Sequence, residues 1–129
     1  MASNDATLFK RVLDMGAQSV MVPYVQTADE AAAAVHAMRY GPLGMRGMAG
    51  MTRATRYGKI DDYFDVAEDE LCLIVQVETL TGLQNLDAIA GTDGVDAVFI
   101  GPADLSASMA LRGQMDHPDV DTAVSNAIK

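Results

Sequence analysis

Several features are scarce in this sequence, and each scarcity excludes a class of protein. The chain of 129 residues contains one cysteine, so it cannot form an internal disulfide. It has 9 basic against 18 acidic residues and a formal net charge of -9, which would repel a phosphate backbone and anionic lipid headgroups. Neither nucleic acid nor a membrane surface is therefore an expected partner.

Long apolar runs are also absent. Runs such as Leu71 to Val77 are far shorter than the roughly 18–20 residues that a membrane-spanning helix needs, and polar residues follow Met1 where a secretory signal would be basic and then apolar. The chain has no glycine-rich phosphate loop and no zinc-ligand spacing. We expect a cytoplasmic protein of about one domain, with a packed core because 50% of its residues are hydrophobic.

Short apolar strands alternate with helical segments along the chain. The predicted strands are residues 17–23, 71–77 and 95–100. The predicted helices are residues 7–15, 28–38, part of 61–70, 81–90, a helix opening within 101–106, and a last helix from His117 onward. The run 71–77 is apolar almost throughout, as expected of a strand covered on both faces. This order predicts an α/β fold with right-handed βαβ units and a parallel sheet whose two edges are open.

A glycine-rich segment separates the first two of these units. Residues 40–60 carry glycines at 41, 44, 47, 50 and 58, which predicts a long loop, and loops of this length are usually functional. Three arginines in it, Arg46, Arg53 and Arg56, could attract an anionic substrate. A solvated loop face is the alternative interpretation of the same residues.

Two strands end in the same way, with a carboxylate ahead of a small-residue turn into a helix. The segments are LIVQVET, which contains Glu78, and AVFIGPADLS, which contains Asp104. Parallel strands have their carboxyl ends on one side, and neighbouring strands lie about 4.8 Å apart, so both acids can reach one ion. A hard cation such as Mg²⁺ or Mn²⁺ often uses only one or two carboxylates, with water and substrate completing its shell. Capping of the following helices is the alternative role for each acid.

Five ordered motifs carry a resemblance to a known family. They are VPYVQTADEA from Val22, RYGPLGMRG from Arg39, LIVQVET from Leu73, GVDAVFIGPADLS from Gly94 and HPDV from His117. Together they closely resemble the HpcH/HpaI aldolase family, which includes 4-hydroxy-2-oxoheptanedioate aldolase and 2-dehydro-3-deoxyglucarate aldolase. The resemblance covers nearly the whole chain, so it is far more specific than any single motif.

The resemblance implies a (β/α)₈ TIM barrel and a site for pyruvate on a divalent metal ion such as Mg, Mn or Co. Residues 1–129 would form a single partial barrel domain of about three central strands, without counterparts of strands one to three and seven to eight. By motif match, Glu78 and Asp104 would be the metal ligands. Gln76 would lie beside the substrate, and the backbone amides of Ala103 and Asp104 would receive the pyruvate carboxylate.

The implied reaction is that of a class II aldolase, the reversible cleavage of a 4-hydroxy-2-oxo acid to pyruvate and an aldehyde. The family's histidine and arginine for proton transfer have no counterpart here, so we assign no residue to that role and expect these residues alone not to turn over substrate. The resemblance also implies a homo-oligomeric full-length parent. Two alternatives are a carbon–carbon lyase of the citrate lyase β-subunit or malyl-CoA lyase type, and a catalytically silent fragment or binding module.

Overall fold

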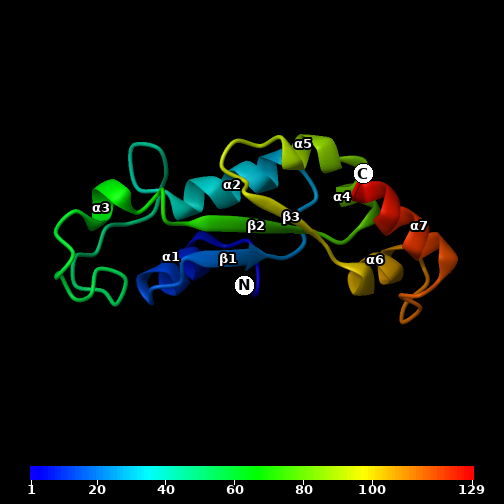
Figure 1. The fold of residues 1–129 in the computed structure, drawn as a ribbon, viewed down its shortest axis with the longest axis horizontal. Helices are drawn as coiled ribbons and strands as arrows, with labels where there is room; N and C mark the ends of the chain where they lie inside the picture. The colour runs from blue at the N-terminus through cyan, green and yellow to red at the C-terminus, as the bar shows by residue number, and fades with distance from the viewer.

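The computed structural model describes all of residues 1–129 as a parallel sheet with helices (Figure 1). The strands are β1 (Ser19–Val22), β2 (Cys72–Val77) and β3 (Ala97–Ile100), in the order β1-β2-β3. The helices are α1 (Ala6–Asp14), α2 (Ala28–Met38), α3 (Tyr63–Val66), α4 (Leu80–Gln84), α5 (Leu86–Ala90), α6 (Pro102–Ser108) and α7 (Pro118–Ala127). The predicted α/β class, the parallel sheet and its two open edges are confirmed. No helix has the length and apolar character needed to cross a lipid bilayer.

The predicted helix 81–90 is the main difference in element boundaries. The structure divides this segment into α4 and α5 at Asn85, whose φ of -103° and ψ of 11° lie outside helical geometry. The Asn85 side chain donates a hydrogen bond of 2.8 Å to the Gln26 carbonyl oxygen, which ties this break to the loop after β1. Helical spacing of the apolar residues survives a one-residue interruption, so the sequence pattern did not reveal it.

The core lies on one face of the sheet. Phe9 and Leu13 of α1 are fully buried against the same cluster as the alanines of α2 and the inward side chains of β1 and β2. Burial alternates along β2: Leu73, Val75 and Val77 are buried, while the residues between them are only half-buried. The expectation that β2 is covered on both faces is therefore wrong for this chain, since the helices that bury the sheet share one side.

The residues predicted to cap the first two helices form the expected hydrogen bonds. Asp5 accepts hydrogen bonds from the amides of Thr7 and Leu8 and so caps α1. The Thr27 hydroxyl accepts from the Glu30 amide, and the Glu30 carboxylate accepts from the Gln26 amide at 2.7 Å. The predicted capping signal at the start of α2 is confirmed, with the return bond made one residue before the cap.

The glycine-rich loop is attached to α1 by a buried ion pair. The Arg46 side chain is fully buried, donates to Asp14 at 2.9 Å and lies over the Tyr40 ring at 4.5 Å from its centroid. Lys10 also pairs with Asp14 at 2.7 Å and donates to the Gly47 carbonyl oxygen. The solvated interpretation is wrong for Arg46, because this guanidinium fixes the loop to the helix.

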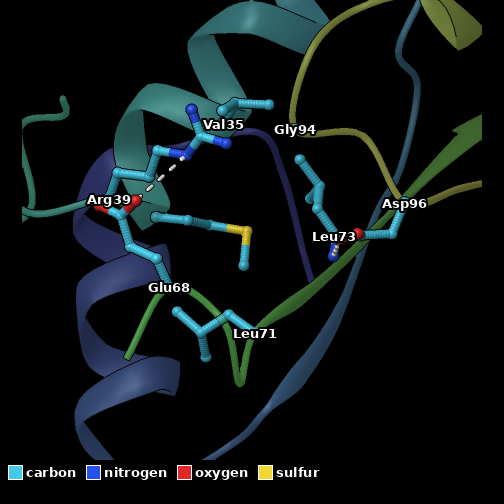
Figure 2. Close-up of a pocket in the computed structure, with 8 residues that line it drawn as sticks. Val35, Arg39, Glu68, Leu71, Leu73, Gly94 and Asp96 are labelled. Atoms are coloured by element: carbon cyan, nitrogen blue, oxygen red, sulfur yellow. Dashed lines mark hydrogen bonds and ion pairs between the residues drawn. The ribbon is translucent and has the colours of Figure 1, made fainter. Parts of the chain in front are cut away.

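A small cavity lies at the amino ends of β2 and β3 (Figure 2). Its volume is about 70 Å³, and Arg39 approaches Glu68 across it at 3.9 Å. At Gly94, which has a φ of +91°, an added Cβ would come within 2.7 Å of the Arg39 guanidinium and of Val35. Gly94 thus allows Arg39 to lie against the end of the sheet.

Replacing Asp14 with Asn should destabilise the fold, because it leaves the buried Arg46 charge without its carboxylate. Removing one partner of a buried ion pair costs about 3–5 kcal/mol, and we expect about 2–3 kcal/mol because the Asp14 side chain keeps 19% of its exposure. Burial raises the Asp14 pKa, but hydrogen bonds and charges from Arg46 and Lys10 outweigh burial and lower it. The stabilisation is therefore complete above the ordinary carboxyl pKa of 3.8 and is lost as the pH falls through the lower folded value.

Denaturant unfolding at several pH values measures this effect. The gap in unfolding free energy between wild type and Asp14→Asn should be wide at neutral pH and should narrow in acid. Lys10→Met is the control, since the Lys10 side chain is 39% exposed and its loss should cost less. A gap of the same width at neutral and acidic pH would show that the Asp14 charge is not responsible.

Candidate active site

The register of β2 and β3 brings the two acid-bearing segments to one end of the sheet. Val77 pairs with Ile100, and the Gly101 amide continues the ladder by donating to the Val77 carbonyl oxygen at 3.1 Å. Glu78 and Gly101 are the next residues on their strands, so the GPADLS turn begins beside Glu78. Both predicted acids therefore lie at the carboxyl ends of the strands, the end at which α4 and α6 begin (Figure 1).

Glu78 is held by residues that lie on or just after each of the three strands. Its side chain is buried, with the residue only 4% exposed. One carboxylate oxygen accepts from the Tyr24 amide at 2.9 Å, and the other accepts from the Gln76 side-chain amide at 3.3 Å. The same oxygen lies against Gly101, where an added Cβ would come within 2.6 Å of it. Glu78 is thus fixed in orientation before any ligand arrives.

Asp104 approaches the same region from the first turn of α6. It is exposed, and its carboxylate accepts a hydrogen bond from the Tyr24 hydroxyl at 3.4 Å. The N-cap of α6 is Gly101, with no side-chain hydrogen bond to the helix amides, and the cap of α4 is Thr79. Neither acid is a helix cap, although Asp104 stands where a negative charge interacts favourably with the helix dipole.

Glu78 and Asp104 are neighbouring carboxylates whose negative charges no basic side chain balances. Burial raises the pKa of Glu78, the hydrogen bond from the Tyr24 amide opposes this, and the charge of Asp104 raises it further. Asp104 also raises the pKa of the Tyr24 phenol, with smaller contributions from partial burial and Glu78. No lysine, arginine or histidine forms an ion pair with either acid. Two carboxylates with unbalanced negative charge are the kind of donor set that suits a hard divalent cation.

The chain itself supplies only part of such a coordination shell. Histidine, cysteine and acidic side chains do not gather anywhere in groups of three or more that could hold a metal ion. Two carboxylates are nevertheless enough for a cation that takes its remaining ligands from water and substrate. The donor set therefore fits a metal that stays open to a small molecule.

The other groups predicted to bind substrate are Gln76 and the backbone amides of Ala103 and Asp104, and they lie at the same end of the sheet as this pair. Gln76 lies on β2 and bonds Glu78 through its side-chain amide, which fixes its orientation. Ala103 and Asp104 occupy the first turn of α6, which no side chain caps, so their amides face the same end of the sheet with the positive end of the helix dipole. The structure thus brings Gln76, Glu78, Ala103 and Asp104 to one region.

The arginines of the glycine-rich loop lie elsewhere. Arg53 and Arg56 line a cavity of about 420 Å³ together with Gln18 and Leu71, which directly precede β1 and β2. This cavity is therefore at the amino ends of the strands, opposite the carboxylates. The interpretation of these arginines as attracting substrate to the carboxylate site is not supported, because the loop folds toward the other end of the sheet (Figure 1).

Tyr24 and Gly101 are site residues that the sequence analysis did not single out as such. Tyr24 follows β1 after Pro23 and has a φ of 58°, an uncommon value for a residue other than glycine, which directs its amide at Glu78. The signal available in the sequence was its position directly after the predicted strand 17–23, at the same end of the sheet as the acids. Its backbone conformation had no sequence signal.

Comparisons with known proteins agree with this geometry. The family model described as HpcH/HpaI aldolase/citrate lyase matches residues 1–129. A hydroxypyruvate/pyruvate aldolase of Sagittula stellata is 58% identical over 121 residues, which are 94% of this chain and 48% of that protein. A pyruvate aldolase of Rhizobium etli is 54% identical over 127 residues, covering 98% of this chain and 50% of the relative.

A solved structure shows the same likeness in three dimensions. The HpcH/HpaI aldolase/citrate lyase family protein from Burkholderia cenocepacia superposes with a TM-score of 0.93 at 43% identity, over 97% of this chain and 50% of that one. The chain thus spans about half the length of the relatives it matches. Its three parallel strands and their helices are part of a TIM-barrel fold. With the family model matching from the first residue to the last, the chain belongs to the HpcH/HpaI aldolase/citrate lyase family.

Proposed function

We propose that this chain carries the metal and pyruvate site of a class II aldolase, which reversibly cleaves a 4-hydroxy-2-oxo acid to pyruvate and an aldehyde. The observation that carries the proposal is the buried Glu78, which is oriented by the Tyr24 amide, lies close enough to Asp104 for that charge to raise its pKa, and has no basic partner. Relatives named pyruvate aldolase and 4-hydroxy-2-oxovalerate aldolase support the substrate class. Assembly of the whole protein into a homo-oligomer is part of the same proposal.

Each site residue has a distinct part in this proposal. Glu78 and Asp104 would hold one divalent cation such as Mg²⁺, Mn²⁺ or Co²⁺, which when bound would act as a Lewis acid on the keto oxygen of the 2-oxo acid. The first-turn amides of Ala103 and Asp104 would receive the substrate carboxylate, as helix N-termini receive anions. Gln76, fixed by its bond to Glu78, would border the keto acid.

Proton transfer is the step to which we assign no residue. General acid–base catalysis needs a side chain within hydrogen-bond reach of the proton that moves. The described groups around the two acids are an amide side chain, a phenol and backbone amides, and His36 lies on the exposed side of α2. We therefore propose that this half of the fold binds and polarises pyruvate, and that residues 1–129 alone do not turn over substrate.

Replacing Asp104 with Asn should separate metal binding from stability. Asp104 neither caps α6 nor bonds its amides, so the midpoint of thermal unfolding should hardly change. Loss of one of two anionic ligands should weaken Mn²⁺ binding by at least tenfold, or about 1.4 kcal/mol. Calorimetric titration with Mn²⁺ and a thermal melt of the same samples measure both quantities.

A matched control is available for this substitution. Asp87 is the first-turn acid of α5, a helix that also lacks a side-chain cap, and Asp87→Asn should leave Mn²⁺ affinity unchanged. If Asp104→Asn binds Mn²⁺ as tightly as wild type, or loses stability in proportion to affinity, the aspartate is structural and the proposed site is wrong.

Replacing Gly101 with Ala should displace Glu78. The φ of Gly101 is -94°, which any residue can adopt, so the effect comes from contact alone. The new Cβ would meet the Glu78 carboxylate at 2.6 Å and its Cβ at 2.9 Å. We expect weaker Mn²⁺ binding and a loss of about 1–3 kcal/mol in unfolding free energy, as for other overpacked sites.

Gly50→Ala is the control, because nothing lies within 4 Å of a Cβ placed there. Calorimetry and denaturant unfolding of both variants are the measurements. Equal Mn²⁺ affinity in Gly101→Ala and wild type would mean that the orientation of Glu78 does not matter for binding.

A further inference from the structure

Tyr24 forms hydrogen bonds to both acids. Its backbone amide donates to Glu78 at 2.9 Å, and its hydroxyl donates to Asp104 at 3.4 Å. These partners lie 54 and 80 residues away along the chain. A single residue after β1 therefore connects the side chains that follow β2 and β3.

The backbone of Tyr24 is held in an unfavourable conformation to make the first contact. Its φ of 58° lies in the left-handed region, which residues with a Cβ avoid. Such conformations persist where the surrounding structure requires them and are concentrated at functional sites. Here the conformation turns the amide inward to the buried Glu78 carboxylate, while the side chain stays 53% exposed.

The second contact is the only hydrogen bond made to the Asp104 carboxylate. Asp104 has no ion-pair partner and sits on the exposed first turn of a short helix, so without Tyr24 its side chain would rotate freely in solvent. An exposed phenol adds little to the core, because half of its surface remains in water. The hydroxyl thus contributes orientation of Asp104 rather than burial.

We propose that Tyr24 is a positioning residue for the carboxylate pair, holding Glu78 through its amide and Asp104 through its hydroxyl so that both can reach one divalent cation. This inference rests on the proposed function, since it assumes that the pair binds a metal. Preorganised ligands bind more tightly because less side-chain freedom is lost on binding. Tyr24 would therefore raise metal affinity without being a ligand itself.

Tyr24→Phe, made in the full-length protein, tests the hydroxyl contact. The ring and backbone stay, and only the bond to Asp104 is lost. Mn²⁺ affinity should fall roughly threefold to tenfold, the range expected for one hydrogen bond, with an unchanged thermal midpoint. The spectrum of bound Mn²⁺ in electron paramagnetic resonance should broaden, since a less ordered Asp104 gives a more heterogeneous shell.

Tyr57→Phe is the matched control. Tyr57 has the same φ of 58° and is 59% exposed, and its hydroxyl forms no hydrogen bond. It lies in the glycine-rich loop, and this variant should bind Mn²⁺ as wild type does. Equal losses in the two tyrosine variants would overturn the proposal, because the effect would then not depend on Asp104.

Tyr24→Val tests the amide contact. A β-branched residue is strained at positive φ, so the amide should turn away from Glu78 and the loss of affinity should exceed that of Tyr24→Phe. The same affinity in both variants would overturn the backbone half of the proposal. If Asp104→Asn loses affinity while Tyr24→Phe matches wild type, the positioning role is wrong and the metal site stands. If wild type does not bind Mn²⁺, the proposed function fails and the positioning role with it.

Discussion

The parallel register of β2 with β3 is the constraint on which the site depends. Pairing of Val77 with Ile100 makes Glu78 and Gly101 neighbours, and the turn after Gly101 then brings α6 and Asp104 to the same end. A shift of one residue would turn alternate side chains to the other face and move Glu78 away from Gly101. The buried face of β2 opposes such a shift, because Leu73, Val75 and Val77 would have to leave the core. Core packing therefore sets the position of the acids.

Glu78 combines burial with the proximity of another anion, which is unfavourable for stability. Its raised pKa expresses this, since burial and Asp104 both disfavour the charged form. The hydrogen bonds from Tyr24 and Gln76 offset only part of the cost. Like-charged groups held together in this way are common where a protein binds a cation or performs chemistry. The rest of the chain places its charges differently: Asp14 at the other end of the sheet is paired with both Arg46 and Lys10.

The sequence predicted what depends on local pattern. The apolar runs, the strand and helix order and the Thr27 cap are properties of neighbouring residues, and parallel topology then placed Glu78 and Asp104 at one end. Contacts between residues far apart in the sequence could not be predicted in this way. The burial of Arg46 requires Asp14 and Tyr40, and the break at Asn85 requires Gln26. The spacing of apolar and polar residues along the sequence does not predict these contacts.

Tyr24 shows the same limit within the site. Its position after β1 is readable from the sequence, but its left-handed backbone exists because Glu78 accepts its amide from 54 residues away. The close approach at Gly101 is similar, since the small residue matters only once the Glu78 side chain lies against it. The position of the two acids at one end of the sheet was thus predictable, and the contacts that orient them were not.

Paramagnetic broadening by Mn²⁺ tests the central claim most directly, because it locates the bound ion. In nuclear magnetic resonance spectra of the ¹⁵N-labelled protein, substoichiometric Mn²⁺ should first broaden the amide signals of Tyr24, Glu78, Ala103 and Asp104. The amides of Gly58 and Gly94, which lie toward the amino ends of the strands, should stay sharp. Broadening that begins at those distant amides, or that spreads evenly over the acidic surface, would contradict a metal site formed by Glu78 and Asp104.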